Sequence, residues 1–447
     1  MNHSEPNKDP NLSSGNHPLT QSEVVGHSFK RSLRLLFSSE KSLFIIFLVN
    51  FATSLQFYIL VTLIPLYFTT EFGYSDIVSG IIFGCFGVAI GVFSIYLSYI
   101  MNRISLKLGL YLSFLIGIIG FGLLLIENSV ISIVAVILVQ SISCAFAWPY
   151  AEYAVKEYST EEIMNISSSC FFVSNYLAGI TTGVIIDYMW VNFSESSDVY
   201  FWSFSIGALS LVLAAICLMF CRRVDYIEQE SNNHEGILSC KKFWRFSLLI
   251  FLLVLLRSTS FGHLDATLPK YLIRTKGSDS HFGLMLSIHS TTMITGLLTL
   301  TVLTYHFTSY NLICIGGFFG AISSVLVILW DDTLVYILFV VLISIGESIW
   351  VPRLLDYTYA VAPKGREGIY LAMSNCPFYF GMILTGTESG VMFDLFCNDD
   401  SSTNCNFIWV LVFLSSLFIF IMLIIFKKFI TETGEFRSEV EYKLIND

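Results

Sequence analysis

Two ionisable side chains, Glu347 and Arg257, each fall near the middle of a long apolar stretch of the sequence. An ionisable group at the centre of a bilayer costs about 2.5–3.5 kcal/mol unless it faces water or a partner, so such residues usually mark a functional site. A desolvated carboxylate near a movable cation can bind and release a proton as its contacts change. The pattern predicts two groups at matched depth that could pair, with Glu347 as the protonation site. The alternative is a static ion pair that only locks two helices together.

Other charged residues lie nearer the ends of the same two apolar stretches. Asp265 and His263 are two residues apart, so on a helix they point to nearly opposite sides. Asp265 is predicted to join the coupling or ion-pair residues, whereas His263 is expected either to line the cavity or to pack through a hydrogen bond. Arg353 and Asp356 are three residues apart and share a helix face, which predicts a local ion pair or an inner gate.

The first half of the chain has no comparable mid-membrane charge, but its apolar stretches carry polar and aromatic side chains. Such groups could bind a small molecule while the charged groups of the second half bind ions. Amide side chains in lipid must find partners, so hydrogen bonds between helices are the alternative. The predicted cavity residues are Asn50, Gln56, Tyr58, Trp148 and Tyr153.

The composition is that of a polytopic membrane protein. Apolar residues make up 55% of the chain and charged residues only 13%, about half the charged share of a soluble domain. Continuous apolar windows of roughly 20 residues are long enough to cross a bilayer. The twelve expected spans are 43–69, 75–100, 106–126, 130–154, 163–187, 199–221, 246–272, 280–304, 310–329, 333–359, 367–393 and 406–429.

The distribution of Lys and Arg predicts the orientation, because cationic residues of short loops stay in the cytoplasm. With both termini inside, only Lys270, Arg274 and Lys276 lie on the outer side. The predicted segments are a cytoplasmic N-terminal tail (1–42), an N-terminal six-helix bundle (43–221), a cytoplasmic linker (222–245), a C-terminal six-helix bundle (246–429) and a cytoplasmic tail (430–447).

The two halves repeat each other at the sequence level. "IPLYF" closes the first span and "LPKYL" the seventh, and "SISCAFAWPYAEYAV" aligns with "SIGESIWVPRLLDYT" so that Pro149 meets Pro352. Parallel six-helix repeats of this kind recur among transporters. Since proline removes a backbone donor, Pro149 and Pro352 are predicted to kink two gating helices.

The chain resembles the major facilitator superfamily over nearly its full length. The turn "YIMNRISLKLG" is similar to the family's turn between spans 2 and 3, with Arg103 and Lys107 at matching places and Asn102 where the family has an acid. "GESIWVPRLLDYTYAVAPKGREGIY" looks like span 10 of drug:proton antiporters and of peptide:proton symporters. The resemblance implies an all-α fold of twelve transmembrane helices in two pseudo-symmetric bundles, with spans 1, 4, 7 and 10 around a central cavity and Arg103 and Lys107 as gating residues.

Cysteines and known enzyme motifs narrow the function further. Cys397 and Cys405 bracket "NDDSST" in a predicted outer loop, where disulfides persist, so they could be bonded. The sequence has no phosphate-binding Gly-Lys-Ser/Thr loop, HExxH motif or Cys-x-x-Cys cluster, the motifs that would indicate an ATPase or a metal site. We therefore expect no enzyme activity, cofactor or metal.

Together these patterns predict a secondary active transporter that moves a small organic solute by alternating access, with protons as the coupling ion. The alternatives are a facilitative uniporter and a transport-inactive transceptor or scaffold, because fold alone does not fix function. We expect a monomer in the lipid bilayer of the plasma membrane or of an endomembrane or vacuole. No basic patch interleaved with aromatics indicates nucleic-acid binding.

Overall fold

The computed structural model of the chain is all-α, as predicted. It describes residues 34–101, 104–126, 130–160, 163–193, 195–222, 241–304, 307–362, 367–397 and 405–431, and no strand occurs in these ranges.

Six helices make up the first half, and their bounds lie within a few residues of the expected spans. Continuous apolar runs explain the agreement, because each run is close to the length that crosses a bilayer. The helices are α2 (Lys41–Thr70), α3 (Asp76–Met101), α4 (Leu106–Ile126), α5 (Val130–Tyr158), α6 (Met164–Asn192) and α7 (Ser196–Met219).

The second half has the same number of expected spans but more interruptions. Within the described residues of both halves, eleven helical segments are long and apolar enough to cross a membrane. The remaining expected span, 367–393, is split at Asn375, and Pro377 in the next turn lacks the N–H that would bond to Met373. The elements are α8 (Lys241–Leu256), η2 (Arg257–Phe261), α9 (His263–Ala266), α10 (Leu268–Lys276), η3 (Gly277–Ser280), α11 (Phe282–Leu303), α12 (Ser309–Leu329), α13 (Thr333–Val361), α14 (Glu367–Ser374), α15 (Cys376–Phe396) and α16 (Phe407–Thr431).

The seventh expected span is not one continuous helix. It begins at Lys241, turns into the π-helical segment η2 at Arg257, and resumes as α9 and α10. The N–H of Gly262 donates to the carbonyl of Arg257 over 2.7 Å, which is the five-residue hydrogen bond of a π turn. Pro269 leaves the carbonyl of Asp265 without its usual helical donor. Because π turns often occur at functional sites, the position of Arg257 in η2 is informative.

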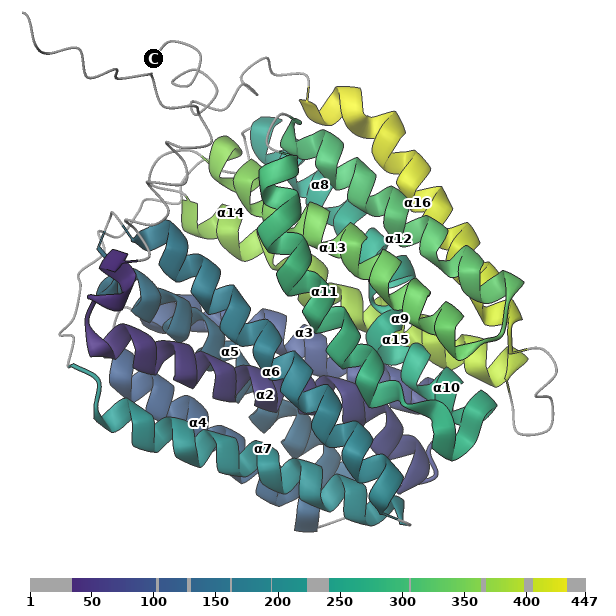
Figure 1. Cartoon of the computed structure of the whole chain (residues 1–447), viewed down its shortest axis with the longest axis horizontal. Helices are drawn as coiled ribbons and strands as arrows, with labels where there is room; N and C mark the ends of the chain where they lie inside the picture. The colour runs from purple at the N-terminus through teal and green to yellow at the C-terminus, as the bar shows by residue number, and fades with distance from the viewer. Residues whose placement is uncertain are drawn as a thin grey trace, which may run out of the picture.

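The two halves lie side by side as separate groups of helices (Figure 1), and α3 packs on α15 while α6 packs on α11. Glycines allow the closest approaches. A Cβ atom on Gly80 would lie 1.9 Å from the carbonyl oxygen of Gly386, and one on Gly183 would lie 2.3 Å from that of Gly283. No side chain fits at these crossings, which lie toward the predicted outer ends of the four helices.

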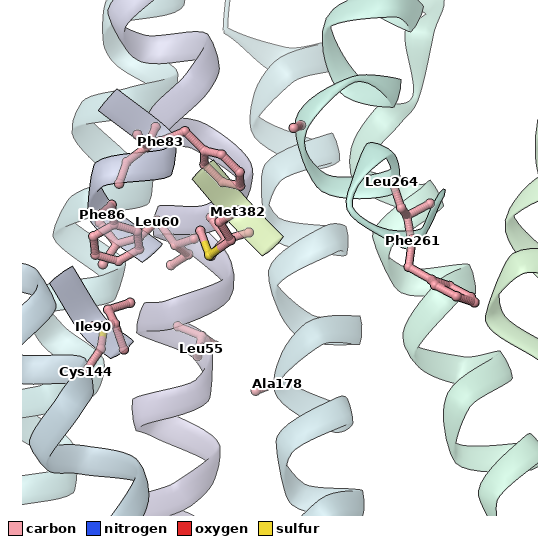
Figure 2. Close-up of a cluster of buried hydrophobic side chains, with 14 of the residues drawn as sticks. Leu55, Leu60, Phe83, Phe86, Ile90, Cys144, Ala178, Phe261, Leu264 and Met382 are labelled. Atoms are coloured by element: carbon pink, nitrogen blue, oxygen red, sulfur yellow. The ribbon is translucent and has the colours of Figure 1, made fainter. Parts of the chain in front are cut away.

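A buried apolar cluster joins the halves at mid-depth. Figure 2 shows Met382 of α15 beside Leu60 of α2 and beside Phe83 and Phe86 of α3. All four side chains are buried. Methionine is unbranched and flexible, so it fills irregular gaps between helices. This contact therefore allows one half to pack closely on the other.

Cys397 and Cys405 form a disulfide, with Cα atoms 4.6 Å apart. It connects the end of α15 to the turn before α16. The carbonyl of Cys397 also accepts a hydrogen bond from Arg274 Nη1 over 2.8 Å, so the end of α15 contacts α10.

Removing this disulfide is expected to lower the free energy of unfolding by about 2–3 kcal/mol, because a short closed loop constrains the unfolded chain by about that amount. Cys397→Ser/Cys405→Ser is compared with wild type in chemical unfolding of the detergent-solubilised protein. Cys85→Ser, at an exposed free cysteine, is the control. Equal stability of the double variant and wild type would contradict the expectation.

The turn between α12 and α13 gives a pH-dependent contact outside the spans. The hydroxyl of Tyr336 donates to Asp331, and Lys276 Nζ lies 2.9 Å from its carboxylate. These two partners lower the pKa of Asp331 from its ordinary value.

Since the folded-state pKa is lower than the unfolded one, this contact stabilises the protein above pH about 4 and is lost as pH falls through the folded pKa. We expect the melting temperature of wild type to fall more steeply than that of Asp331→Asn below pH 4. Parallel melting curves for the two proteins would show that Asp331 makes no such contribution.

Candidate functional site

Three charged residues of the second half, Arg257, Asp265 and Glu347, meet in one cluster. Arg257 Nη2 donates to Asp265 Oδ2 over 3.0 Å, and Arg257 Nη1 lies 4.0 Å from Glu347 Oε1. Asp265 is thus the nearer partner of Arg257, whereas the sequence suggested pairing with Glu347. The irregular backbone from η2 to α9 brings Arg257 and Asp265, eight residues apart, to the same site.

His289 of α11, whose role the sequence left undecided, completes the cluster. Its Nε2 lies 3.9 Å from Glu347 Oε2, and its Nδ1 makes a 2.9 Å hydrogen bond with the hydroxyl of Ser344. The ring of Tyr176, from α6 in the first half, lies against it with the ring centres 6.5 Å apart. His289 therefore connects the carboxylate of α13 to the opposite half.

The cluster is enclosed but not fully sealed. The side chains of Arg257 and Asp265 are 15% and 20% exposed, and that of Glu347 is 8% exposed. Arg257 Nε and Nη1 have no hydrogen-bond acceptor within the described residues. Two carboxylates thus share one guanidinium that still has unused donors. Such an arrangement can exchange a proton or a charged ligand for an existing contact.

Tyr58 of α2, one of the residues predicted to line the cavity, lies near this cluster. The carboxylates of Asp265 and Glu347 and the side chain of Asn175 of α6 are among its neighbours. Its ring also packs near Gly179, where an added Cβ would lie 3.3 Å from it. Polar residues of the first half therefore contribute one wall of the site.

Asn50 and Gln56 lie elsewhere, within the first half itself. Asn50 Nδ2 donates to Ser174 Oγ over 2.7 Å, and Gln56 Nε2 donates to Gln140 Oε1 over 2.9 Å and to Ser143 Oγ over 3.2 Å. These contacts correspond to the alternative interpretation, in which amide side chains hold neighbouring helices together.

His263 is also in a packing position. Its ring Nδ1 shares a 2.7 Å hydrogen bond with the hydroxyl of Thr267, and its Nε2 lies 3.7 Å from Glu388 of α15.

Two aromatic residues of α5 were also predicted to line the cavity. Trp148 packs edge-on against Phe171, with ring centres 5.5 Å apart, and also lines a cavity between the halves. Tyr153 is partly buried.

The predicted gating residues make contacts within their own halves. Arg353 pairs with Asp356 over 2.7 Å and also donates to Thr304 over 3.2 Å. Lys107 donates to the carbonyl of Cys221. Pro149 and Pro352 lie inside α5 and α13. The remaining gating residue, Arg103, lies outside the described residues.

Ion pairs between the halves occur at the predicted outer end, and sequence reasoning missed them. Asp76, at the start of α3, lies 3.1 Å from Lys270 Nζ and 2.7 Å from Arg274 Nη2 of α10. Asp187 of α6 lies 3.1 Å from the ring of His281, which precedes α11. The available signal was that Lys270 and Arg274, four residues apart on one helix face, are two of the few outer cations.

The opposite end of the interface is hollow. A cavity of about 150 Å³ lies between α3 and α5 of the first half and α14 and α15 of the second. Its lining residues belong to the predicted cytoplasmic thirds of these helices. The halves are therefore joined by ion pairs at the predicted outer end, and a cavity lies between them toward the predicted cytoplasmic end.

Comparison with known proteins agrees with this architecture. The sequence model of the Major Facilitator Superfamily matches residues 46–386. No curated protein matches the sequence. Among solved structures, the chain is similar to the nucleoside transporter NupG at 15% identity and a TM-score of 0.68, covering 87% of this chain and 100% of that one. A POT family transporter in complex with 5-aminolevulinic acid matches at 14% identity and a TM-score of 0.71, covering 87% of this chain and 96% of that one.

Proposed function

The chain belongs to the Major Facilitator Superfamily, and we propose that it is a secondary active transporter that couples the movement of a small organic solute to protons. Membership of a transporter family agrees with the prediction that the chain is not an enzyme. It is a multi-pass integral membrane protein. The observation that carries the proposal is the buried cluster in which Asp265 and Glu347 share Arg257.

Charge balance in the cluster supports coupling to a proton. If both carboxylates are ionised and His289 is neutral, the single guanidinium leaves one negative charge uncompensated in an enclosed site. Burying an unpaired charge is expensive, so binding one proton or one cation stabilises the cluster. Glu347 is the residue proposed to take the proton, because Asp265 already accepts a hydrogen bond from Arg257 and Glu347 does not.

The position of the cluster supports alternating access. It lies between the contacts at the outer end, made by Asp76 with Lys270 and Arg274, and the cavity on the cytoplasmic side. In our proposal this arrangement is an inward-facing state with a closed outer gate. Rocking of one half against the other would break the outer ion pairs and close the cavity.

The proposal does not yet name the class of solute. The similar structures are a nucleoside transporter and POT family transporters, and at such low identity this similarity defines the fold alone. A useful panel therefore includes nucleosides, dipeptides, amino acids, sugars and organic cations.

The test is a thermal-shift screen of the purified protein against this panel at pH 5.5 and 7.5. A ligand present at about 100 times its dissociation constant adds about 2.7 kcal/mol to the free energy of unfolding. We expect one solute class to stabilise the wild type in a pH-dependent way that Glu347→Gln removes. Binding that is equal at both pH values and in the variant would favour the uniporter instead.

A further inference from the structure

The cavity on the cytoplasmic side has a composition that differs from that of the central cluster. Glu152 of α5 is the only charged residue among those that line it, and the other polar linings are neutral. Its walls carry three aromatic side chains, Trp148 from the first half and Tyr379 and Phe380 from the second. A single carboxylate among aromatic rings is a combination that attracts cations, because ring faces and carboxylates are both negative.

Glu152 has no basic partner within the described residues. The nearest basic residue along α5 is Lys156, one turn further toward the cytoplasm, and it makes no ion pair with Glu152. In the same part of the chain no other salt bridge reaches Glu152, although its side chain is exposed to the space between the halves. The carboxylate is therefore available to a positively charged ligand.

We propose that this cavity, lined by Glu152, Trp148, Tyr379 and Phe380, binds organic cations with an aromatic or apolar body. The inference rests on the proposed transport function and names its solute class. The cationic group would lie beside Glu152, and the apolar part would pack between Trp148 and the α15 rings. Asn375 and Ser94, also in the lining, can accept hydrogen bonds from an amine.

The position of α15 joins this cavity to the central cluster. Phe380 lines the cavity, and the next residue, Gly381, faces Arg257: a Cβ there would lie 3.1 Å from Arg257 Cγ. The central cluster carries one carboxylate more than its guanidinium neutralises. When both of its carboxylates are ionised, the net negative charge of this cluster favours a cation over an anion in the neighbouring cavity.

Direct binding of a permanently charged probe tests the inference. Radiolabelled benzyltrimethylammonium is used because its charge does not change with pH, and neopentylbenzene is its uncharged isostere. We expect the cation to bind the full-length protein at least about tenfold more tightly than the isostere, since the carboxylate contributes only to the cation. Glu152→Gln should reduce cation binding about tenfold, and Trp148→Leu should reduce it roughly three- to tenfold.

Two further variants distinguish the effect of the carboxylate at position 152 from effects that any substitution in α5 would have. Glu152→Asp keeps the carboxylate and should retain most of the binding, whereas Glu157→Gln, on the same helix outside the cavity lining, should bind like wild type. Melting temperatures of all variants show that they remain folded. Equal binding of cation and isostere, or unchanged cation binding by Glu152→Gln, would overturn the inference.

The same preparation distinguishes this inference from the proposed function. If the cation does not bind but a pH gradient drives uptake of another solute into proteoliposomes, the solute class is wrong and proton coupling stands. If the cation binds as expected but no solute responds to a pH gradient, the cavity assignment stands and proton-coupled transport is wrong.

Discussion

Glu347→Gln is expected to abolish solute accumulation driven by a pH gradient while preserving exchange of labelled for unlabelled solute. For one proton per solute, with the membrane potential clamped at zero, each pH unit supplies about 1.4 kcal/mol, or about a tenfold accumulation ratio. The variant should fall to a ratio of about one, because glutamine keeps the shape of the side chain but cannot exchange a proton. Proteoliposomes with valinomycin and a fixed pH difference provide the measurement.

Glu388→Gln is the matched control for this variant. Glu388 is also a glutamate in the second half, but it lies beside His263, with a side chain that is 35% exposed. The Glu388→Gln variant should accumulate solute like wild type. A tenfold ratio retained by Glu347→Gln would show that the proton binds elsewhere, with Asp265 as the next residue to substitute.

Asp76→Asn is expected to lower the free energy of unfolding by about 3–5 kcal/mol, the typical cost of removing one partner from a buried ion pair. The substitution leaves Lys270, which is 4% exposed, and Arg274 without their shared carboxylate between the two halves. Chemical unfolding of the purified protein measures the loss. In the proposed inward-facing state these contacts close the outer end, so the variant should also favour outward-open states.

Two comparisons make this expectation specific. Asp331→Asn removes an exposed carboxylate from Lys276 at the same end of the protein, and exposed pairs are worth about 0–1 kcal/mol. Asp76→Asn/Lys270→Gln/Arg274→Gln removes the buried charges together and should recover much of the lost stability. If Asp76→Asn and Asp331→Asn are equally mild, the outer ion pairs do not hold the halves together.

The spans were predictable from the sequence because apolar length is a local property. Each observed helix lies close to an expected span, and the mid-membrane depth of Glu347 and Arg257 follows directly from their positions along those spans. The proximity of Asp265 to Arg257 was harder to predict from the sequence. It depends on a π turn and on irregular backbone before Pro269, and a hydropathy pattern predicts neither of these features.

Contacts between helices distant in the sequence were the main feature that the sequence did not predict. Asp76 and Arg274 are 198 residues apart, and their pairing follows from how the halves pack at glycine crossings. Gln56 was expected in the cavity, whereas its hydrogen bonds go to Gln140 and Ser143 of α5. The sequence shows that such an amide needs a partner, but only the packing of α2 on α5 identifies which one.

Solute-dependent proton movement is the most direct test of proton coupling. Proteoliposomes are loaded with the pH indicator pyranine, with equal pH on both sides and the potential clamped, and a solute identified by the thermal-shift screen is added outside. A change in internal pH that requires both the solute and Glu347 is the predicted result. Solute uptake without any change in internal pH would contradict coupling and identify a uniporter.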